Sequence, residues 1–122
     1  MSSLRDGRID YVELPARDLS ATRSFFENLF GWQFSDWGPD YISFGDGAMN
    51  GGFYRSEHAS RVEKGGTLVV IYWPDLEDLY KKIVDAGGTI VKEIFSFPGG
   101  RRFHFLGPSG NEFGVWSEQL AE

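Results

Sequence analysis

Few residues in this 122-residue sequence could act as nucleophiles or hold a metal. It contains no cysteine, and its two histidines lie far apart, without a partner at the i+2 or i+4 spacing of a metal site. His58 falls in a polar segment, where a solvated side chain is expected. His104 alternates with Phe103 and Phe105. We therefore predict a structural or half-exposed histidine that faces away from both rings.

Other motifs do not define a reaction either. The sequence has no Gly-x-Ser-x-Gly nucleophile elbow. The glycine-rich stretch 45–52 precedes a predicted strand and not a helix, which favours a tight hairpin over a phosphate-binding loop. Glu13 and Glu112 fall in predicted strands, where they either face a ligand or pair across strands. The catalytic residues, if there are any, are therefore unknown from the sequence.

Composition narrows the class of protein. A formal net charge of -6 and a pI of about 4.9 argue against a nucleic-acid partner and weakly favour cationic ligands. No apolar stretch is long enough to span a membrane, and the N-terminal segment has no apolar signal core, so we expect a cytoplasmic protein with no membrane partner. Eleven Phe and four Trp residues indicate an aromatic core or pocket.

The first half of the chain predicts one strand, one helix and three short strands. Residues 9–14 alternate as a strand, which Pro15 should end. Asp18 precedes an apolar pattern of helical spacing and Gly31 follows it, as expected for an N-cap and a C-terminal stop. Short strands are predicted at 32–34, 41–44 and 51–54.

The second half repeats this order. A strand at 67–73, a helix that starts after Asp75, and strands at 89–95, 102–106 and 112–116 are predicted. An offset of 57 maps Asp18 to Asp75, and an offset of 62 maps Gly52 to Gly114. We predict one α+β domain, 1–122, built from two βαβββ modules (about 8–55 and 67–118) joined by a linker (56–66). The modules should form a curved, cupped mixed sheet with the helices outside, and a concave aromatic face is a natural ligand site.

Two segments resemble a known superfamily. ELPARDLSATRSFFENLFGW is similar to the first-module signature of the vicinal-oxygen-chelate proteins, the glyoxalase/bleomycin-resistance/dioxygenase superfamily, and FHFLGPSGNEFGVW is similar to its closing signature. The resemblance covers roughly residues 8–118 and implies the two-module fold. Gly107 replaces the usual aspartate before Pro108, which alters a turn and not a catalytic group.

The same resemblance implies where a metal would be held, on the first and last strands of each module. None of these positions carries a strong ligand, so no metal site and no cofactor are expected. The positions are Tyr11 (or Asp10), Leu68 or Val69, Gly52 and Gly114.

Strand alternation then predicts the residues that line the cup. Tyrosine and tryptophan would provide walls and polar handles, and the glycines would leave volume for a ligand. The predicted ligand-binding residues are Tyr11, Glu13, Gly52, Tyr54, Tyr72, Gly114 and Trp116.

Three functions fit these features. The first is a metal-free protein that binds a small aromatic or cationic molecule, similar to the bleomycin-resistance branch, whose members use clefts between two subunits. The second is a metal-dependent lyase or dioxygenase of the glyoxalase type, and the third is a non-enzymatic interaction module. The resemblance also implies a homodimer. The sequence favours the first function and leaves enzymatic activity undecided.

Overall fold

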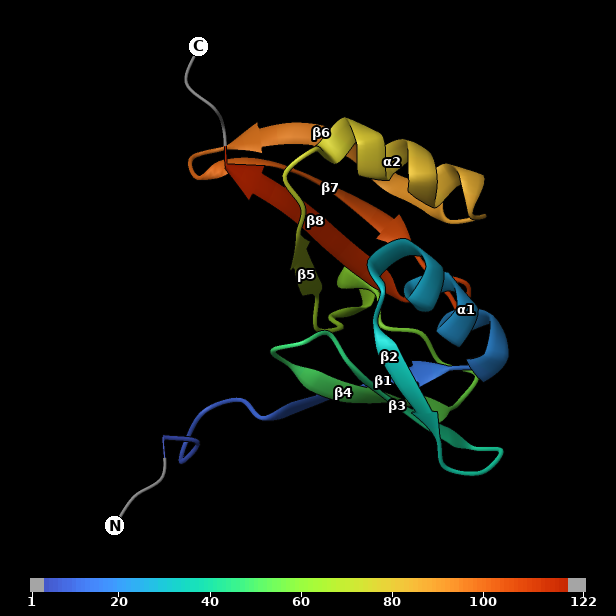
Figure 1. The fold of residues 1–122 in the computed structure, drawn as a ribbon. Helices are drawn as coiled ribbons and strands as arrows, with labels where there is room; N and C mark the ends of the chain where they lie inside the picture. The colour runs from blue at the N-terminus through green and yellow to red at the C-terminus, as the bar shows by residue number, and fades with distance from the viewer. Residues whose placement is uncertain (1–3, 119–122) are drawn as a thin grey trace.

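The computed structural model describes residues 4–118, which fold as two modules of one helix and four strands each (Figure 1). Module 1 contains β1 (Tyr11–Ala16), α1 (Leu19–Phe30), β2 (Gln33–Asp36), β3 (Tyr41–Gly45) and β4 (Asn50–Arg55). The segment between the modules contains one short 3-10 helix, η1 (Val62–Lys64). Module 2 contains β5 (Val69–Tyr72), α2 (Leu76–Asp85), β6 (Thr89–Phe97), β7 (Gly100–Leu106) and β8 (Glu112–Glu118).

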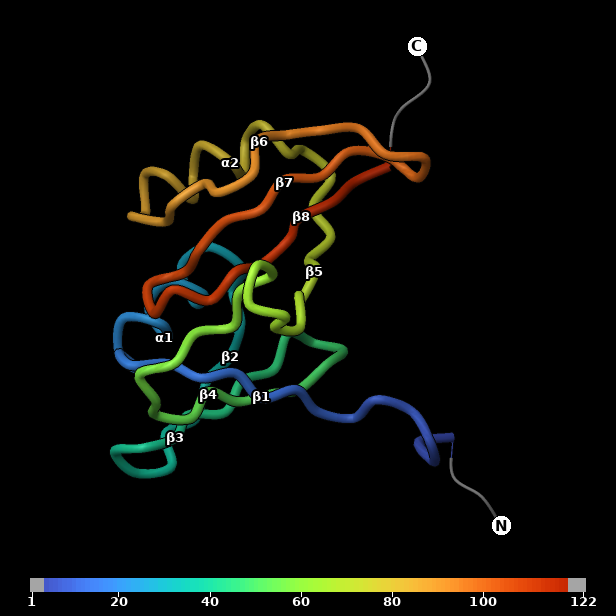
Figure 2. The backbone as a smooth tube through the Cα atoms, turned by 180° about the vertical axis from the view of Figure 1, so that it is seen from behind, coloured from blue at the N-terminus to red at the C-terminus, as the bar shows by residue number. Residues whose placement is uncertain are grey.

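The modules form two separate sheets of the same topology, ordered β1-β4-β3-β2 and β5-β8-β7-β6. In each sheet the module's first strand runs parallel to its last strand, and the other neighbours are antiparallel. Both helices lie on the same side of the molecule, as Figure 2 shows from behind. The predicted α+β class with two βαβββ modules is confirmed. The outermost ends of the predicted domain lie outside the described residues.

The helix boundaries follow from the predicted caps. The Asp18 carboxylate accepts a hydrogen bond of 2.9 Å from the Ala21 N–H, and Gly31 ends α1 at a φ of 70°. The Asp75 carboxylate likewise accepts from the Asp78 N–H at 3.1 Å. Capping carboxylates satisfy N–H groups that have no partner within the helix, which fixes where each helix begins.

The prediction that Pro15 ends the first strand is wrong. β1 continues through Pro15 to Ala16, and Pro15 stands opposite Tyr54 of β4. β1 is the edge strand of its sheet and pairs only with β4. A proline in an edge strand can place its missing N–H on the unpaired side, so it need not remove a hydrogen bond from the ladder.

An aromatic core joins the two modules. Phe26 on α1 is 1% exposed and packs against Phe53 of module 1 at a centroid distance of 5.8 Å. It also packs edge-on against Phe113 of module 2 at 5.0 Å. The neighbouring Phe25 lies 6.0 Å from Phe105 on β7. Helix α1 thus contributes to both halves of the core, and much of the aromatic content is structural.

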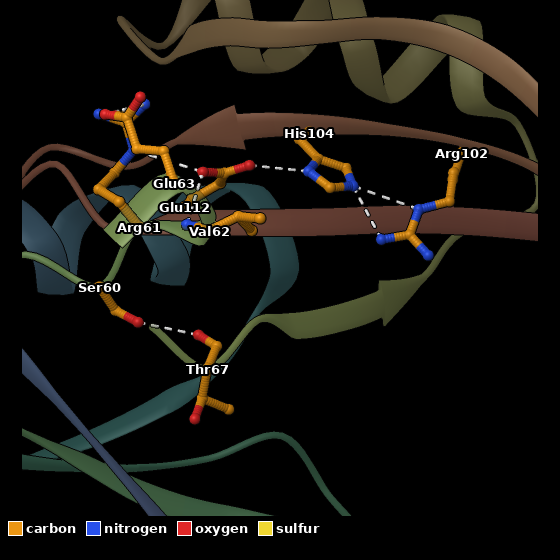
Figure 3. A network of polar contacts seen from close by, with 8 residues as sticks. All are labelled: Ser60, Arg61, Val62, Glu63, Thr67, Arg102, His104 and Glu112. Carbon is orange, nitrogen blue, oxygen red and sulfur yellow. Dashed lines mark hydrogen bonds and ion pairs between the residues drawn. The ribbon is translucent and has the colours of Figure 1, made fainter. Parts of the chain in front are cut away.

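The predicted linker is more than a connection, because it docks on both modules. The Ser60 N–H donates to the Asn111 side-chain carbonyl at 2.7 Å. The Ser60 hydroxyl donates to the Thr67 carbonyl at 2.8 Å (Figure 3). Asn111 is 2% exposed and also donates to the Pro15 carbonyl at 2.6 Å. The Ser56 N–H donates to the Ala16 carbonyl at 3.1 Å and the Glu112 N–H donates to the Ser60 carbonyl at 2.8 Å, which ties the segment to β1 and to the start of β8.

Within residues 4–118, no helix is both long and apolar enough to cross a membrane.

Candidate functional site

Each sheet has one face packed into the core and an opposite face, which we call the open face. In β1, Leu14 is buried in the core while the ring of Tyr11 is 41% exposed, as strand alternation requires. The module 1 open face carries Tyr11, Glu13, Tyr41, Ser43, Gly52 and Tyr54. The module 2 open face carries Val70, Tyr72, Arg102, His104, Glu112, Gly114 and Trp116. Every predicted ligand-binding residue therefore lies on an open face.

The two sets of predicted residues are not joined. Tyr11, Glu13, Gly52 and Tyr54 belong to one sheet, and the remaining three belong to the other. Between residues 4 and 118, no hydrogen bond or ring contact connects the two sets. The exposed aromatic rings on the open faces, 42% for Tyr54 and 47% for Tyr72, are available to a ligand or to another chain.

Three side chains of the module 1 open face form a chain of hydrogen bonds. The Tyr41 hydroxyl donates to the Glu13 carboxylate at 2.9 Å and lies 2.5 Å from the Tyr11 hydroxyl. Since Tyr41 uses its only proton on Glu13, Tyr11 must donate to Tyr41. The free positions of this chain are thus acceptors, namely the Tyr11 oxygen lone pairs and the second Glu13 oxygen.

The same contacts keep Tyr41 protonated. Burial raises the pKa of the Tyr41 phenol, and the hydrogen bonds with Tyr11 and Glu13 raise it further. Tyr41 therefore acts as a neutral donor that fixes the Glu13 carboxylate. Sequence reasoning missed Tyr41, although the pairing of 41–45 with 50–54 in a hairpin would have placed it beside Tyr54 on the same face.

The two glycines on the open faces differ in the space around them. A β-carbon at Gly52 would lie 1.9 Å from the Tyr41 hydroxyl oxygen and 2.9 Å from that of Tyr11. A β-carbon at Gly114 would meet nothing nearer than 3.4 Å, the distance to Arg102 Nη2 and to Val70 Cγ2. Gly52 is therefore required by the tyrosine pair, whereas position 114 could accept a methyl group at ordinary contact distance.

We expect Gly52→Ala to be destabilising and Gly114→Ala to be nearly neutral. The added methyl at position 52 must displace the Tyr41 ring and break its hydrogen bonds, at a cost of about 1–3 kcal/mol. The methyl at position 114 fits at ordinary contact distance. Urea denaturation of both variants measures the difference, and equal stabilities would contradict the assigned role of Gly52.

A groove of about 720 Å³ adjoins the module 1 open face. Its walls come from β2, β3 and the 45–50 turn, and Tyr11 reaches into it. Hydroxyl and amide side chains contribute much of the lining, namely Gln33, Ser35, Ser43 and Asn50. The predicted glycine-rich hairpin is therefore part of a concave surface, and its short side chains keep that surface open.

The module 2 open face has an aromatic half. Tyr72 and Trp116 stand opposite each other in the parallel β5–β8 pair, with ring centroids 5.3 Å apart. The Tyr72 hydroxyl is hydrogen-bonded to Glu118, which raises the pKa of the Tyr72 phenol. Trp116 also contacts Phe97 on β6 at 6.4 Å.

The other half of this face is a buried polar network (Figure 3). His104 is 5% exposed, and its Nδ1 lies 2.8 Å from the Glu112 carboxylate. Its Nε2 lies 2.8 Å from Arg102 Nη2 and 3.2 Å from Arg102 Nε. A guanidinium can only donate, so Nε2 accepts and Nδ1–H donates to Glu112. His104 is thus a neutral ring with a fixed tautomer between a carboxylate and a guanidinium.

Glu112 is anchored from its other side by the linker. Arg61 Nε lies 3.3 Å from Glu112 Oε1, and the Val62 N–H donates to the same oxygen at 3.2 Å. Burial alone would raise the pKa of the Glu112 carboxyl, but the hydrogen bonds from His104, Val62 and Arg61 outweigh burial and lower it. Glu112 is therefore held as a carboxylate.

His104 lies on the face of β7 opposite to that of Phe103 and Phe105, as its alternation predicted. The sequence did not reveal the network in which it is buried. The hairpin that turns at residues 107–111 could have indicated this network. Its register pairs His104 with Gly114, and this pairing places Glu112 and Arg102 on the same face as His104. His58 is exposed and has no contact with this network.

The residues at the four positions implied for a metal do not fit one. At Gly52 the Tyr41 hydroxyl occupies the place of a ligating side chain, and Leu68 and Gly114 carry no donor atom. Tyr11 is engaged with Tyr41. Within residues 4–118, no three His, Cys, Asp or Glu side chains are grouped to hold a metal.

Two βαβββ modules with open polar faces define a protein of the vicinal-oxygen-chelate fold. The chain belongs to the Glyoxalase/Bleomycin resistance protein/Dioxygenase superfamily, whose family model matches residues 8–115. A structure of a glyoxalase/bleomycin resistance protein/dioxygenase family enzyme from Burkholderia phytofirmans PsJN is similar, with a TM-score of 0.73 at 19% identity, and covers 88% of this chain and 98% of that one. The fosfomycin resistance protein FosX from Listeria monocytogenes has a TM-score of 0.75 at 14% identity, covering 92% and 93%.

A curated relative is named "Putative glyoxylase CFP32", from Mycobacterium bovis and Mycobacterium tuberculosis. It is 23% identical over 128 aligned positions, which cover 94% of this chain and 47% of the relative. The chain thus spans about half the length of the curated relatives it matches. At these identities the solved structures establish the fold alone.

Proposed function

We propose that this protein binds a small organic molecule, aromatic or cationic, on the open faces of its sheets without a catalytic metal. The observation that carries the proposal is the Tyr11–Tyr41–Glu13 chain, whose free positions are all acceptors. Such a surface receives N–H donors and ammonium groups, and the Tyr11 and Tyr54 rings add faces that attract cations. The groove beside Tyr11 offers room for the rest of the molecule.

A second copy of the chain is proposed to cover the open faces. Val70 is 43% exposed, Tyr54 42% and Tyr72 47%, and a second subunit would remove this apolar surface from water. A homodimer would enclose a ligand between subunits and exclude water from it. Light scattering on the purified protein measures the mass. A cytoplasmic location remains a prediction from the sequence.

The experiment is a titration with benzylammonium, an aromatic cation, followed by calorimetry and by amide chemical shifts. We expect binding that perturbs β1, β3 and β4. Glu13→Gln should weaken it about 10- to 100-fold, because a hydrogen bond to a charged group contributes about 1.5–3 kcal/mol. Glu57→Gln removes an exposed charge from another surface and should leave the affinity unchanged.

Two results would overturn the proposal. One is the absence of binding or of shifts on either open face with benzylammonium, neutral benzyl alcohol and benzoate alike. The other is stoichiometric Ni, Zn, Fe or Mn that survives dialysis of the purified protein. Retained metal would favour the metal-dependent lyase or dioxygenase.

A further inference from the structure

Two cations on the module 2 open face share one aromatic ring. Arg102 Cζ lies 5.8 Å from the centroid of Phe95, and Lys92 Nζ lies 4.8 Å from the same centroid. Arg102 Cζ is also 5.9 Å from the centroid of Phe97. Rings seat and orient a guanidinium, but they do not neutralise it. The face also carries two carboxylates, but Glu112 is bonded to His104, Arg61 and Val62, and Glu118 is bonded to the Tyr72 hydroxyl.

Neither cation has a carboxylate partner within residues 4–118. The adjacent Arg101 shows the contrast, since its Nη1 and Nη2 lie 2.7 and 3.0 Å from the two oxygens of Glu77. Arg101 points toward α2 and Arg102 toward the open face. Arg101 is thus paired with a carboxylate of the fold, whereas Arg102 could pair with the anionic group of another molecule.

The guanidinium of Arg102 is held in place by His104 and still has N–H donors without a partner in the described part of the chain. Its Nε–H and one Nη2–H converge on His104 Nε2, and His104 is in turn fixed by Glu112. Two N–H groups on Nη1 and one on Nη2 remain free. The free outer edge of a guanidinium is the edge that pairs in bidentate fashion with a carboxylate or phosphonate. Orientation in advance reduces the entropic cost of binding.

Aromatic side chains adjoin the guanidinium. Gly114 is buried, and a β-carbon there would lie 3.4 Å from Arg102 Nη2, so the β8 backbone passes close to the guanidinium with no side chain between them. Trp116 stands opposite Arg102 across the β7–β8 pair and contacts Phe97 and Tyr72. An anion at Arg102 would thus have aromatic walls next to it.

We propose that the module 2 open face binds the oxyanion group, a carboxylate or a phosphonate, of a small organic ligand. Arg102 pairs with two oxygens, Lys92 adds a second positive charge, and the rings of Phe97 and Trp116 contact the apolar part. This inference rests on the proposed function, because it assigns a charge class to ligands of the same open faces. It differs from that proposal in the face used and in the sign of the group bound.

The test uses benzoate, phenylphosphonate and neutral benzyl alcohol, titrated by calorimetry. We expect at least one of the two anions to bind with a higher affinity than the alcohol. The affinity for that anion should fall as NaCl is added. Preference between the two anions identifies the carboxylate or the phosphonate as the native group. In the arginine side-chain region of the ¹⁵N spectrum, the Arg102 Nε–H signal should shift on anion addition.

Substitutions test whether anion binding depends on Arg102. Arg102→Met should lower anion affinity about 10- to 100-fold, and Arg102→Lys, which keeps the charge but not the paired donors, should give a smaller loss. Arg101→Met is the matched control and should bind like the wild type. If Arg102→Met does not fold, Arg102→Lys and the Nε–H shift carry the test.

Failure of anion binding in the wild type, or equal affinities in Arg102→Met and wild type, overturns this inference. The proposed function survives that failure if benzylammonium still binds in a Glu13-dependent way. Binding of anions alone, dependent on Arg102, supports the present inference and removes the cation preference of the earlier proposal.

Discussion

Phe26→Ala is expected to lower the free energy of unfolding by about 3–5 kcal/mol, a large share of the 5–15 kcal/mol typical of a domain. The ring is 1% exposed and stacks on Trp32 at 4.7 Å. It also contacts Phe53 in module 1 and Phe113 in module 2, so truncation opens a cavity where the modules meet. Denaturant unfolding followed by tryptophan fluorescence measures the loss.

A phenylalanine outside this core provides the control. Phe97 is only half-buried at the end of β6, and Phe97→Ala should cost about 1 kcal/mol, as typical substitutions do. Because α1 belongs to both halves of the core, the Phe26 variant should still unfold in one transition, at lower denaturant. Equal costs for both variants would contradict the central position of Phe26, and separate transitions for the two modules would show that the rest of α1 does not hold the two halves of the core together.

Glu112→Ala should have the second largest effect, a loss of about 3 kcal/mol. The 8% exposed carboxylate accepts from His104 Nδ1, the Val62 N–H and Arg61 Nε, and its removal leaves buried donors without a partner. Glu77→Ala is the matched control. It breaks a surface ion pair with Arg101 and should cost less than about 1 kcal/mol.

Glu112 also gives the stability a pH dependence of known sign. The pKa of this carboxyl is lower in the folded protein than its ordinary value of 4.5, so the unfolded chain takes up the proton first as the pH falls. The stabilisation is complete above about pH 4.5 and is lost as the pH drops through the folded value. Melting temperatures of wild type and Glu112→Gln between pH 6 and pH 3 should converge; a constant difference would contradict this assignment.

The helices and the repeat could be predicted because their causes are local. Asp18 and Asp75 cap the helices through N–H groups three residues away, and Gly31 supplies a left-handed φ that other residues avoid. Local alternation also placed Tyr11 and Trp116 on the correct faces. The extension of β1 through Pro15 was missed because an edge strand is defined by its neighbours, which local sequence does not reveal.

The polar networks depended on contacts between distant segments. Tyr41 meets Glu13 only through the pairing of β3 with β4 and of β4 with β1. Arg61 reaches Glu112 only because the segment that resembled a linker docks on β8.

By itself, the sequence determined the two-module α+β fold, the helix ends and the alternation of side chains along each strand, since these follow from spacing along the chain. The tertiary structure alone decided which charged side chains are paired within the fold. It paired Arg101 with Glu77 and held Arg102 against His104 without a carboxylate within the described part of the chain. It also placed the Tyr41 hydroxyl where a β-carbon of residue 52 would lie. Hydrogen bonds and close packing act over a few ångströms, and only folding brings these residues that near.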